Sequence, residues 1–185
     1  MILEAQVRTG SYGNFVGWAA SSTTSLLPSG FVDPGSIQQA AENAVLLAGV
    51  AACDIAFTHV HAMGNPNGDG PEVLGVAEAL AAERGLKNKL VLLNHKANFG
   101  HSEYASGMTA LLSSILALHH CCVPIHIGVT NPIEEIRSNA NLMLPVKTPV
   151  LLRQQDEMHA SISGTSISGM AAQHELVCTW HVTEP

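Results

Sequence analysis

Two histidines, His61 and His101, each follow an apolar segment and stand in a stretch rich in glycine, asparagine and acidic residues. Neutral imidazole donates one hydrogen bond and accepts another near neutral pH. Two imidazoles that converge can therefore stabilise an oxyanion or move a proton. A single histidine at the end of a strand is more often structural, so the interpretation depends on the residues around each ring. The nucleophile that such chemistry would need is missing from both stretches.

The segment after His61 has the composition of a tight loop. Gly64 and Gly68 permit backbone conformations that other residues resist. Asn67 and Asp69 can hold such a loop through hydrogen bonds from the backbone to their side chains. The pattern predicts a loop that fixes the position of His61.

His101 follows a glycine at the predicted beginning of a helix. Free backbone N–H groups and the positive end of the helix dipole favour a neutral imidazole and a nearby anion there. Lys96 can orient a carboxylate or the imidazole, or it can extend from a strand end to solvent. Glu72 and Glu103 are expected in first helical turns, where favourable placement against the dipole competes with a catalytic role. The residues by themselves leave these alternatives open.

Two patterns are similar to metal sites but lack a full ligand set. The run from Asn65 to Gly70 is like the front of a calcium loop, but Val76 occupies the twelfth position, where a bidentate glutamate is needed. His59 and His61 fall on one face of a predicted strand, but no third zinc ligand follows at a suitable spacing. We therefore predict no metal.

The composition indicates one globular domain with a large interface. The 185 residues are 46% hydrophobic, which suffices for a core, but only 12% are charged. A typical soluble domain has about 25% charged residues. So few charges predict that a partner covers part of the surface.

Charge, cysteine and hydropathy patterns exclude several classes of protein. A net charge of −7 with eight scattered lysines and arginines argues against DNA or RNA as a partner. The four cysteines have no metal-type spacing, and the adjacent Cys121 and Cys122 are poorly placed for an internal bridge, so reduced thiols and a cytoplasmic location are expected. Neither an export signal nor a membrane-spanning segment is expected.

Hydrophobic periodicity and turn residues predict alternating strands and helices. Strands are expected over 2–9, 55–61, 89–95, 159–166 and 173–182, and helices over 36–47, 72–84 and 102–119. Ser36 is expected to cap the first helix and Pro71 to stand in the first turn of the second. Residues 10–35 are expected to form a long loop and 123–152 to be irregular. The order predicts an α/β domain with a mixed five-stranded sheet and both histidine motifs beyond strand ends.

The two histidine motifs resemble those of the C-terminal half of the ketosynthase domain of polyketide and fatty acid synthases, a thiolase-type fold. The family's H-G-T-G-T-x-x-G-D-x-x-E is similar to the stretch that contains His61, Gly64, Gly68, Asp69 and Glu72. Its K-x-N-x-G-H-x-E-x-A-x-G is similar to the stretch that contains Lys96, Asn98, Gly100, His101, Glu103, Ala105 and Gly107. A weaker likeness to the closing S-F-G-x-x-G runs from Ser163 to Gly169.

The resemblance implies that residues 1–185 are one lobe of a larger body. In the family, this C-terminal lobe pairs with an N-terminal lobe of like topology into an αβαβα body, and the N-terminal lobe carries the nucleophilic cysteine. None of the four cysteines here matches that cysteine's motif. The resemblance therefore implies a partner that supplies it, either an N-terminal lobe or a cysteine-bearing subunit, in a dimer or heteromer.

The resemblance also assigns roles. His61 and His101 would stabilise the enolate oxygen when a malonyl thioester loses carbon dioxide, and Lys96 would support them. Gly64, Asp69, Glu72, Asn98 and Glu103 would support the site structurally. No cofactor is expected to be bound, and the substrate arm would be the phosphopantetheine of an acyl carrier protein.

Several positions depart from the family pattern. Met63 and Asn65 replace two threonines that are thought to contact the phosphopantetheine, and Thr165 and Ser166 replace Phe and Gly of the closing segment. These four residues are expected to contact substrate in an altered pocket. They leave an alternative open, a non-catalytic chain-length-factor-like or scaffold subunit that shapes a partner ketosynthase. A free-standing module that binds an acyl or pantetheine ligand is a third hypothesis.

Overall fold

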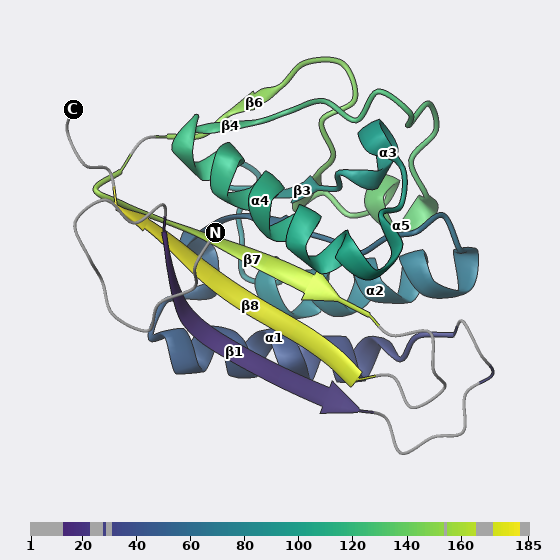
Figure 1. Ribbon diagram of the computed structural model, residues 1–185, viewed down its shortest axis with the longest axis horizontal. Coiled ribbons are helices and arrows are strands. Elements are labelled where there is room, and N and C mark those ends of the chain that lie inside the picture. Colours follow the sequence, from purple (N-terminus) through teal and green to yellow (C-terminus); the bar gives the residue numbers. More distant parts are fainter. Residues whose placement is uncertain (1–12, 23–27, 29–30, 154, 166–171, 182–185) are drawn as a thin grey trace.

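The computed structural model describes residues 13–22, 28, 31–153, 155–165 and 172–181, and Figure 1 shows a sheet covered by helices on both faces. The main sheet has six strands in the order β1-β8-β7-β2-β3-β5, and a small second sheet joins β4 and β6. The strands are β1 (Asn14–Ser22), β2 (Ile55–His59), β3 (Leu90–Leu93), β4 (Cys122–Val123), β5 (Leu142–Met143), β6 (Val150–Leu151), β7 (Glu157–Gly164) and β8 (Ala172–His181).

The sheet is mixed, as the sequence predicted. β2 runs parallel to β3 and β7, and β3 runs parallel to β5. β8 is antiparallel to both β1 and β7. The predicted α/β class is thus confirmed, but the predicted count of five strands is wrong, because the short β5 adds a strand within the segment expected to be irregular.

Two helical layers enclose the sheet. The helices are α1 (Pro34–Ala48), α2 (Pro66–Leu80), α3 (Lys96–Phe99), α4 (Ser106–His119) and α5 (Glu134–Arg137), with 3-10 turns η1 (Ala52–Asp54) and η2 (Glu103–Ala105). α1 and α2 lie on one face and α4 on the other (Figure 1). Along β3, Leu90 and Leu92 join the core under α1 and α2, whereas Val91 and Leu93 join the core under α4. This alternation is typical of a strand that is buried on both faces.

The first strand is where sequence and structure differ most. The strand predicted over 2–9 lies outside the described residues, and part of the predicted loop over 10–35 is β1. A Cβ atom built on Gly17 would lie 2.1 Å from the carbonyl oxygen of Ala44 in α1. Glycine in this segment therefore permits close contact between strand and helix and does not mark a loop.

The first helix begins earlier than predicted. Asp33 is its N-cap, and the carboxylate of Asp33 accepts hydrogen bonds from the backbone N–H of Gly35 at 3.3 Å and from the hydroxyl of Ser36 at 2.7 Å. Ser36 therefore donates to the cap and is not the cap itself. Gly49, with φ 69°, is the C-cap and ends the helix.

The second helix also begins before its predicted first residue. Asn65 is the N-cap, Pro66 stands in the first turn, and Pro71 lies inside the helix. The segment expected to be a glycine-rich loop thus becomes helical after residue 65. In consequence, Asp69 and Glu72 both project from α2, next to the residues that follow β2.

The predicted helix over 102–119 is divided. α4 begins only at Ser106, and η2 and α3 precede it.

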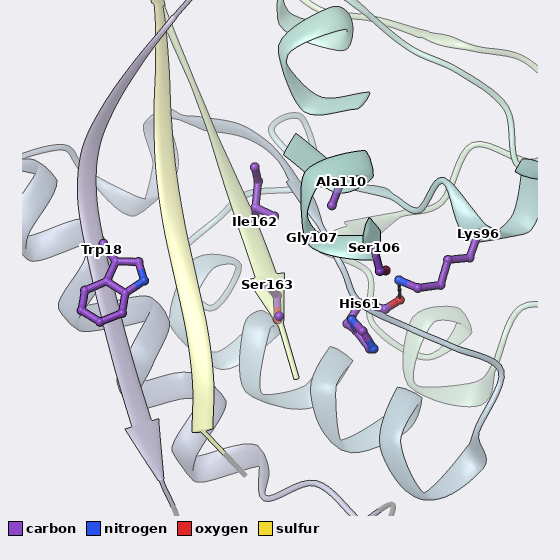
Figure 2. A pocket seen from close by; sticks show the side chains of 9 residues that line it. Trp18, His61, Lys96, Ser106, Gly107, Ala110, Ile162 and Ser163 are labelled. Carbon is purple, nitrogen blue, oxygen red and sulfur yellow. Dashed lines mark hydrogen bonds between the residues drawn. The ribbon is translucent and has the colours of Figure 1, made fainter. Parts of the chain in front are cut away.

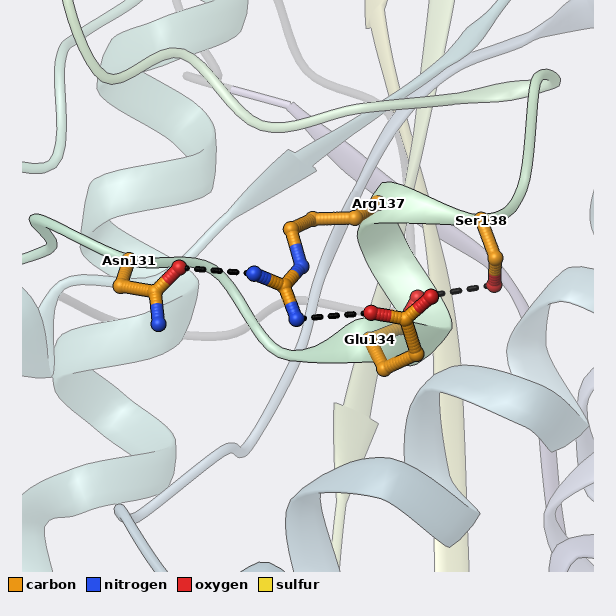
Figure 3. Close-up of polar contacts among 4 residues, drawn as sticks. All are labelled: Asn131, Glu134, Arg137 and Ser138. Carbon is orange, nitrogen blue, oxygen red and sulfur yellow. Dashed lines mark hydrogen bonds and ion pairs between the residues drawn. The ribbon is translucent and has the colours of Figure 1, made fainter.

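In the segment predicted as irregular, α5 is stabilised by Arg137, which donates to the carboxylate of Glu134 at 2.7 Å and to the side-chain oxygen of Asn131 at 3.0 Å (Figure 3). Both final strands are confirmed within two residues. Among the described residues, no helix has both the length and the apolar character needed to cross a bilayer.

Candidate active site

Two carboxylates of α2 hold the backbone that carries His61. Glu72 accepts hydrogen bonds from the N–H groups of His61 at 2.6 Å and Ala62 at 2.8 Å. Asp69 accepts from the N–H groups of Met63 at 3.0 Å and Gly64 at 2.9 Å. Four consecutive amides after β2 are thus bound by two acidic side chains one turn apart. The loop is fixed from one side by α2, although its sequence contains two residues with positive φ, Ala62 and Gly64.

Glu72 is only 1% exposed. Burial raises the pKa of its carboxyl group, while the hydrogen bonds from Ala62, His61 and the Ser163 side chain oppose this rise. The residue reaches no solvent and binds backbone directly. Its place in the structure is that of an anchor for the His61 loop.

Lys96 approaches the same loop from the end of β3. Its ammonium group donates a hydrogen bond to the carbonyl oxygen of His61. Burial lowers the pKa of Lys96, and the carboxylates of Glu72 and Asp69 oppose the shift. The lysine therefore does not extend to solvent, which was one of the alternatives left open by the sequence.

The His61 and His101 rings lie close together. Their centroids are 5.6 Å apart, and the ring planes meet at 79°, edge to face. The segments that carry them are 40 residues apart in sequence and come from the ends of two neighbouring parallel strands. The structure thus brings together the two histidines singled out from the sequence.

The hydrogen bonds of His101 define its tautomer. Its Nδ1 atom accepts a hydrogen bond from the backbone N–H of Glu103 at 2.9 Å, so the ring proton lies on Nε2. His101 was predicted to stand at the beginning of a helix. In the structure, η2 separates it from α4. A local backbone N–H, not a helix dipole, orients this ring.

His61 is held neutral by its surroundings. Burial, together with the nearby Lys96 and His101, lowers its pKa to about 4. Its Nε2 atom is buried and has no hydrogen-bond partner among the described residues. The site therefore places a neutral His61 ring beside the His101 ring and the Lys96 side chain.

A cavity of about 320 Å³ is lined by His61 and Lys96. Figure 2 shows the Lys96 side chain extended toward the His61 carbonyl, with Ser106 beside them and Trp18 on the far side, on β1. The buried hydroxyl of Ser106 has no hydrogen-bond partner among the described residues. The remaining lining residues are small or apolar: Gly107, Ala110, Ile162, Ser163 and Gly164. The cavity suits a largely apolar group with one polar end.

The other predicted site residues have varied positions. Asn65 caps α2 and accepts from the N–H of Asn67 at 3.1 Å. Met63 lines a second cavity of about 540 Å³, on whose wall Lys96 also lies. Thr165 follows β7 directly, and Ser166 lies outside the described residues. Met63 and Asn65 therefore do not line the cavity that His61 lines.

Asn98 and Glu103 act away from the cavity. Asn98 donates to the carbonyl of Ile125 at 2.9 Å and accepts from the N–H of Ile127 at 2.8 Å, which ties α3 to the segment after β4. The side chain of Glu103 is exposed, and its backbone N–H is the group that bonds His101. Neither residue lines the cavity that His61 lines.

Asn94 is a site residue that the sequence analysis missed. Its side-chain amide donates to the carbonyls of Val60, His61 and Ala62, at 3.2, 3.1 and 2.8 Å, and its side-chain oxygen accepts from the N–H of Lys96 at 2.6 Å. It joins the two motifs directly. The only signal in the sequence was a polar residue at the end of a buried apolar run.

Neither a metal site nor a disulfide accompanies these groups in the described part of the chain. No cluster of three or more histidine, cysteine or acidic residues there could hold a metal ion. Cys53, Cys121 and Cys122 are free thiols, and none of them lines the cavity.

Comparison with known proteins identifies the family. Residues 12–130 match the family described as beta-ketoacyl synthase, C-terminal domain. The highly reducing polyketide synthase azaB of Aspergillus niger is 32% identical over 117 residues, which are 63% of this chain and 5% of that protein. Desertorin synthase of Aspergillus desertorum is 33% identical over 87 residues, 47% of this chain and 5% of that protein.

A solved structure has the same fold. An oxazolomycin ketosynthase domain of Streptomyces albus JA3453, OzmH KS7, superposes with a TM-score of 0.80 at 17% identity and covers 94% of this chain and 31% of that chain. The chain therefore has the thiolase-like fold of ketosynthases and spans a small part of the polyketide synthases it matches. By its sequence match over 12–130, the chain belongs to the family of beta-ketoacyl synthase C-terminal domains.

Proposed function

We propose that this lobe contributes the two-histidine half of a decarboxylative Claisen condensation site in polyketide or fatty acid synthesis. The observation that carries the proposal is the edge-to-face pair of His61 and His101, with ring centroids 5.6 Å apart. Lys96 donates to the carbonyl of His61. These groups match the chemistry that the condensation requires.

In this reaction, the bond between the α-carbon of a malonyl thioester and its carboxylate breaks, and carbon dioxide leaves. The electron pair forms an enolate whose negative charge lies on the thioester oxygen. The Nε2–H of His101 donates to this oxygen, and the neutral ring of His61 provides the second contact. The enolate carbon then attacks the acyl thioester of a cysteine, and the cysteine leaves as thiolate.

The low pKa of His61 supports a role as a neutral donor. At about 4, it keeps the ring uncharged throughout the physiological pH range. An uncharged donor does not bind the substrate carboxylate as an ion pair, so it does not stabilise the ground state. The ammonium group of Lys96 adds positive potential near the developing oxyanion.

In this proposal the cysteine comes from an N-terminal lobe or a partner subunit. Cys121 and Cys122 follow the C-terminal end of α4, a helix of 14 residues and therefore about 20 Å long. The cavity contacts the first turn of that helix, at Ser106. Cys53 is exposed and precedes β2, whereas His61 follows this strand.

The exposed face of α4 supports a covering lobe. Met108, Leu112 and Leu116 are 47%, 44% and 56% exposed and recur at intervals of four residues on one side of the helix. An apolar helix face beside the cavity is typical of an interface. With a lobe on this face, the cavity gains the wall on which the cysteine would stand.

The substrate arm would be the phosphopantetheine of an acyl carrier protein. Met63 lies on the second cavity and Asn65 caps a helix, so the contacts that this arm makes must differ from those of the family's threonines. This departure favours a second candidate function, a chain-length-factor-like or scaffold subunit that shapes a partner's pocket. The two candidates differ in whether the histidines are needed for turnover.

The deciding experiment measures carbon dioxide release from malonyl carrier protein by the full-length protein with its cysteine-bearing lobe. Wild type is compared with His61→Ala and His101→Ala, and His120→Ala, an exposed histidine after α4, is the matched control. Loss of carbon dioxide release in His61→Ala and His101→Ala, but not in His120→Ala, supports a catalytic role. Equal release in all four proteins supports the scaffold.

A further inference from the structure

Three consecutive backbone N–H groups after β3 donate to side chains and not to backbone carbonyls. Asn94 donates to Nε2 of His126 at 2.8 Å, and His95 donates to Nε2 of His59 at 3.3 Å. Lys96 donates to the side-chain oxygen of Asn94 at 2.6 Å. The turn that presents Lys96 to the His61 loop is therefore held by two imidazoles and one amide.

The acceptor role of His59 follows from its neighbours. Its ring is 0% exposed, and Nε2 also lies 3.0 Å from Nδ1 of His95. Because the N–H of His95 points at this same nitrogen, Nε2 of His59 carries the lone pair and Nδ1 of His95 is the donor. Nε2 of His59 thus accepts hydrogen bonds from both the backbone N–H and the side chain of His95, the residue before Lys96.

The tautomer of His126 follows in the same way. Its ring is 1% exposed, and Nδ1 lies 2.9 Å from the carbonyl oxygen of Pro145, which can only accept. Nδ1 therefore carries the proton, and Nε2 accepts from Asn94. A second proton on this ring would set two N–H groups against each other.

We propose that His59 and His126 are positioning residues for Lys96, which they hold through lone pairs that only a neutral imidazole supplies. Protonation of either ring removes an acceptor from the turn at residues 94–96. The ammonium group of Lys96 would then lose its place on the His61 carbonyl. The turn is thus sensitive to acid, although neither ring lines the cavity.

The surroundings keep both rings neutral at physiological pH. Burial, together with the nearby His95, Lys96 and His126, lowers the pKa of His59 to about 3. Burial also lowers the pKa of His126, while its bond to Pro145 opposes the shift. All the titratable groups that act on His59 are basic, so no neighbouring carboxylate favours its protonation.

The effect on catalysis rests on the proposed function, but the state of the rings does not. Hydrogen–deuterium exchange at the C2 position of each histidine, followed by mass spectrometry in the full-length protein, reports the pH midpoint of each ring. His59 and His126 are expected to exchange slowly, with a midpoint of about 3 for His59 and one below the ordinary histidine value for His126. A midpoint near the ordinary value of about 6.5 for either ring would overturn the proposal, and this measurement needs no variant.

Variants test the positioning directly. In His59→Leu, the turn loses its acceptor and Lys96 moves away, so the His61 midpoint rises from about 4 toward the ordinary value, because Lys96 helps to keep it low. Carbon dioxide release falls by about 100-fold, as displacement of a catalytic group predicts. His59→Gln retains an oxygen acceptor and should preserve the wild-type midpoint and rate.

A matched control separates positioning from general loss of stability. Thr58 precedes His59 on the same strand, is buried, and bonds Ser161 at 3.3 Å. Thr58→Val should lower the melting temperature and leave the His61 midpoint unchanged. An unchanged midpoint in His59→Leu, or an equal change in His59→Leu and His59→Gln, would overturn the proposal. If His59 and His126 have the expected low midpoints but the wild-type protein releases no carbon dioxide, the proposed function would instead be contradicted.

Discussion

The carboxylate of Glu72 accepts hydrogen bonds from both His61 and Ala62, at 2.6 and 2.8 Å. Glu72 belongs to α2, and His61 follows β2, so this contact joins the helix to the strand end at the point where the site begins. The buried charge is offset by backbone donors, as in other buried carboxylates. The position of His61 therefore depends on a residue that never contacts the cavity.

Replacement of Glu72 should destabilise the protein. In Glu72→Gln, one side-chain oxygen becomes an NH₂ group that faces a backbone N–H, so a buried donor loses its partner. We expect the free energy of unfolding to fall by about 1–3 kcal/mol, measured by urea denaturation. Glu78→Gln, an exposed position on the same helix, is the control and should change the free energy little. Equal effects at both positions would contradict this interpretation of the anchor.

Replacement of Asn94 should uncouple the two histidine motifs. Asn94→Leu leaves three carbonyl groups and the Lys96 N–H without their partner. We expect a loss of stability of about 2 kcal/mol or more together with a higher pH midpoint for His61, measured by urea unfolding and C2 exchange. Asn43→Leu, at an exposed position on α1, is the control. If the His61 midpoint in Asn94→Leu equals that of the wild type, Asn94 does not connect the motifs.

The protein should lose stability as the pH falls below about 6.5. The folded pKa of His59 is about 3, and those of His61 and His95 are about 4, whereas an unfolded histidine titrates near 6.5. Between these values the unfolded state binds more protons, so stability falls with decreasing pH, by about 1.4 kcal/mol per pH unit for each such ring. Urea unfolding at a series of pH values checks this slope.

The slope has an internal control. His59→Gln removes one of the buried rings, so its stability should depend less steeply on pH than that of wild type over the same range. If the two proteins have the same slope, the His59 ring is not held neutral in the folded state.

The apolar face of α4 should respond to mutation only when a lobe covers it. Leu116 is 56% exposed, and truncation of an exposed leucine usually changes stability by about 0.5 kcal/mol or less. If an N-terminal lobe packs on it, Leu116→Ala should cost about 2–5 kcal/mol in the full-length protein. Thermal or urea unfolding measures the difference. Leu151→Ala, at a position 79% exposed on β6, is the control, and a similar small effect at both positions would place the lobe elsewhere.

The periodic elements were accessible from the sequence. The buried run of β3 and the pattern of α4 predicted a strand and a helix within a few residues, because burial on one or two faces determines the spacing of apolar side chains. β1 was not predicted, since Gly17 is typical of a loop unless the helix that packs against it is known. The extent of α2 was missed because Pro66 and Pro71 both suit a first turn, and only the Asn65 cap distinguishes them.

By itself, the amino-acid sequence determined the α/β class and the two histidine motifs, because periodicity and motif spacing are local properties. Only the tertiary structure decided that the His61 and His101 rings meet, since their contact depends on the parallel pairing of β2 and β3. It also revealed that His59 and His126 accept hydrogen bonds from the turn that carries Lys96. Hydrogen bonds between residues more than 30 positions apart leave no periodic signal, and they require the folded chain to bring donor and acceptor together.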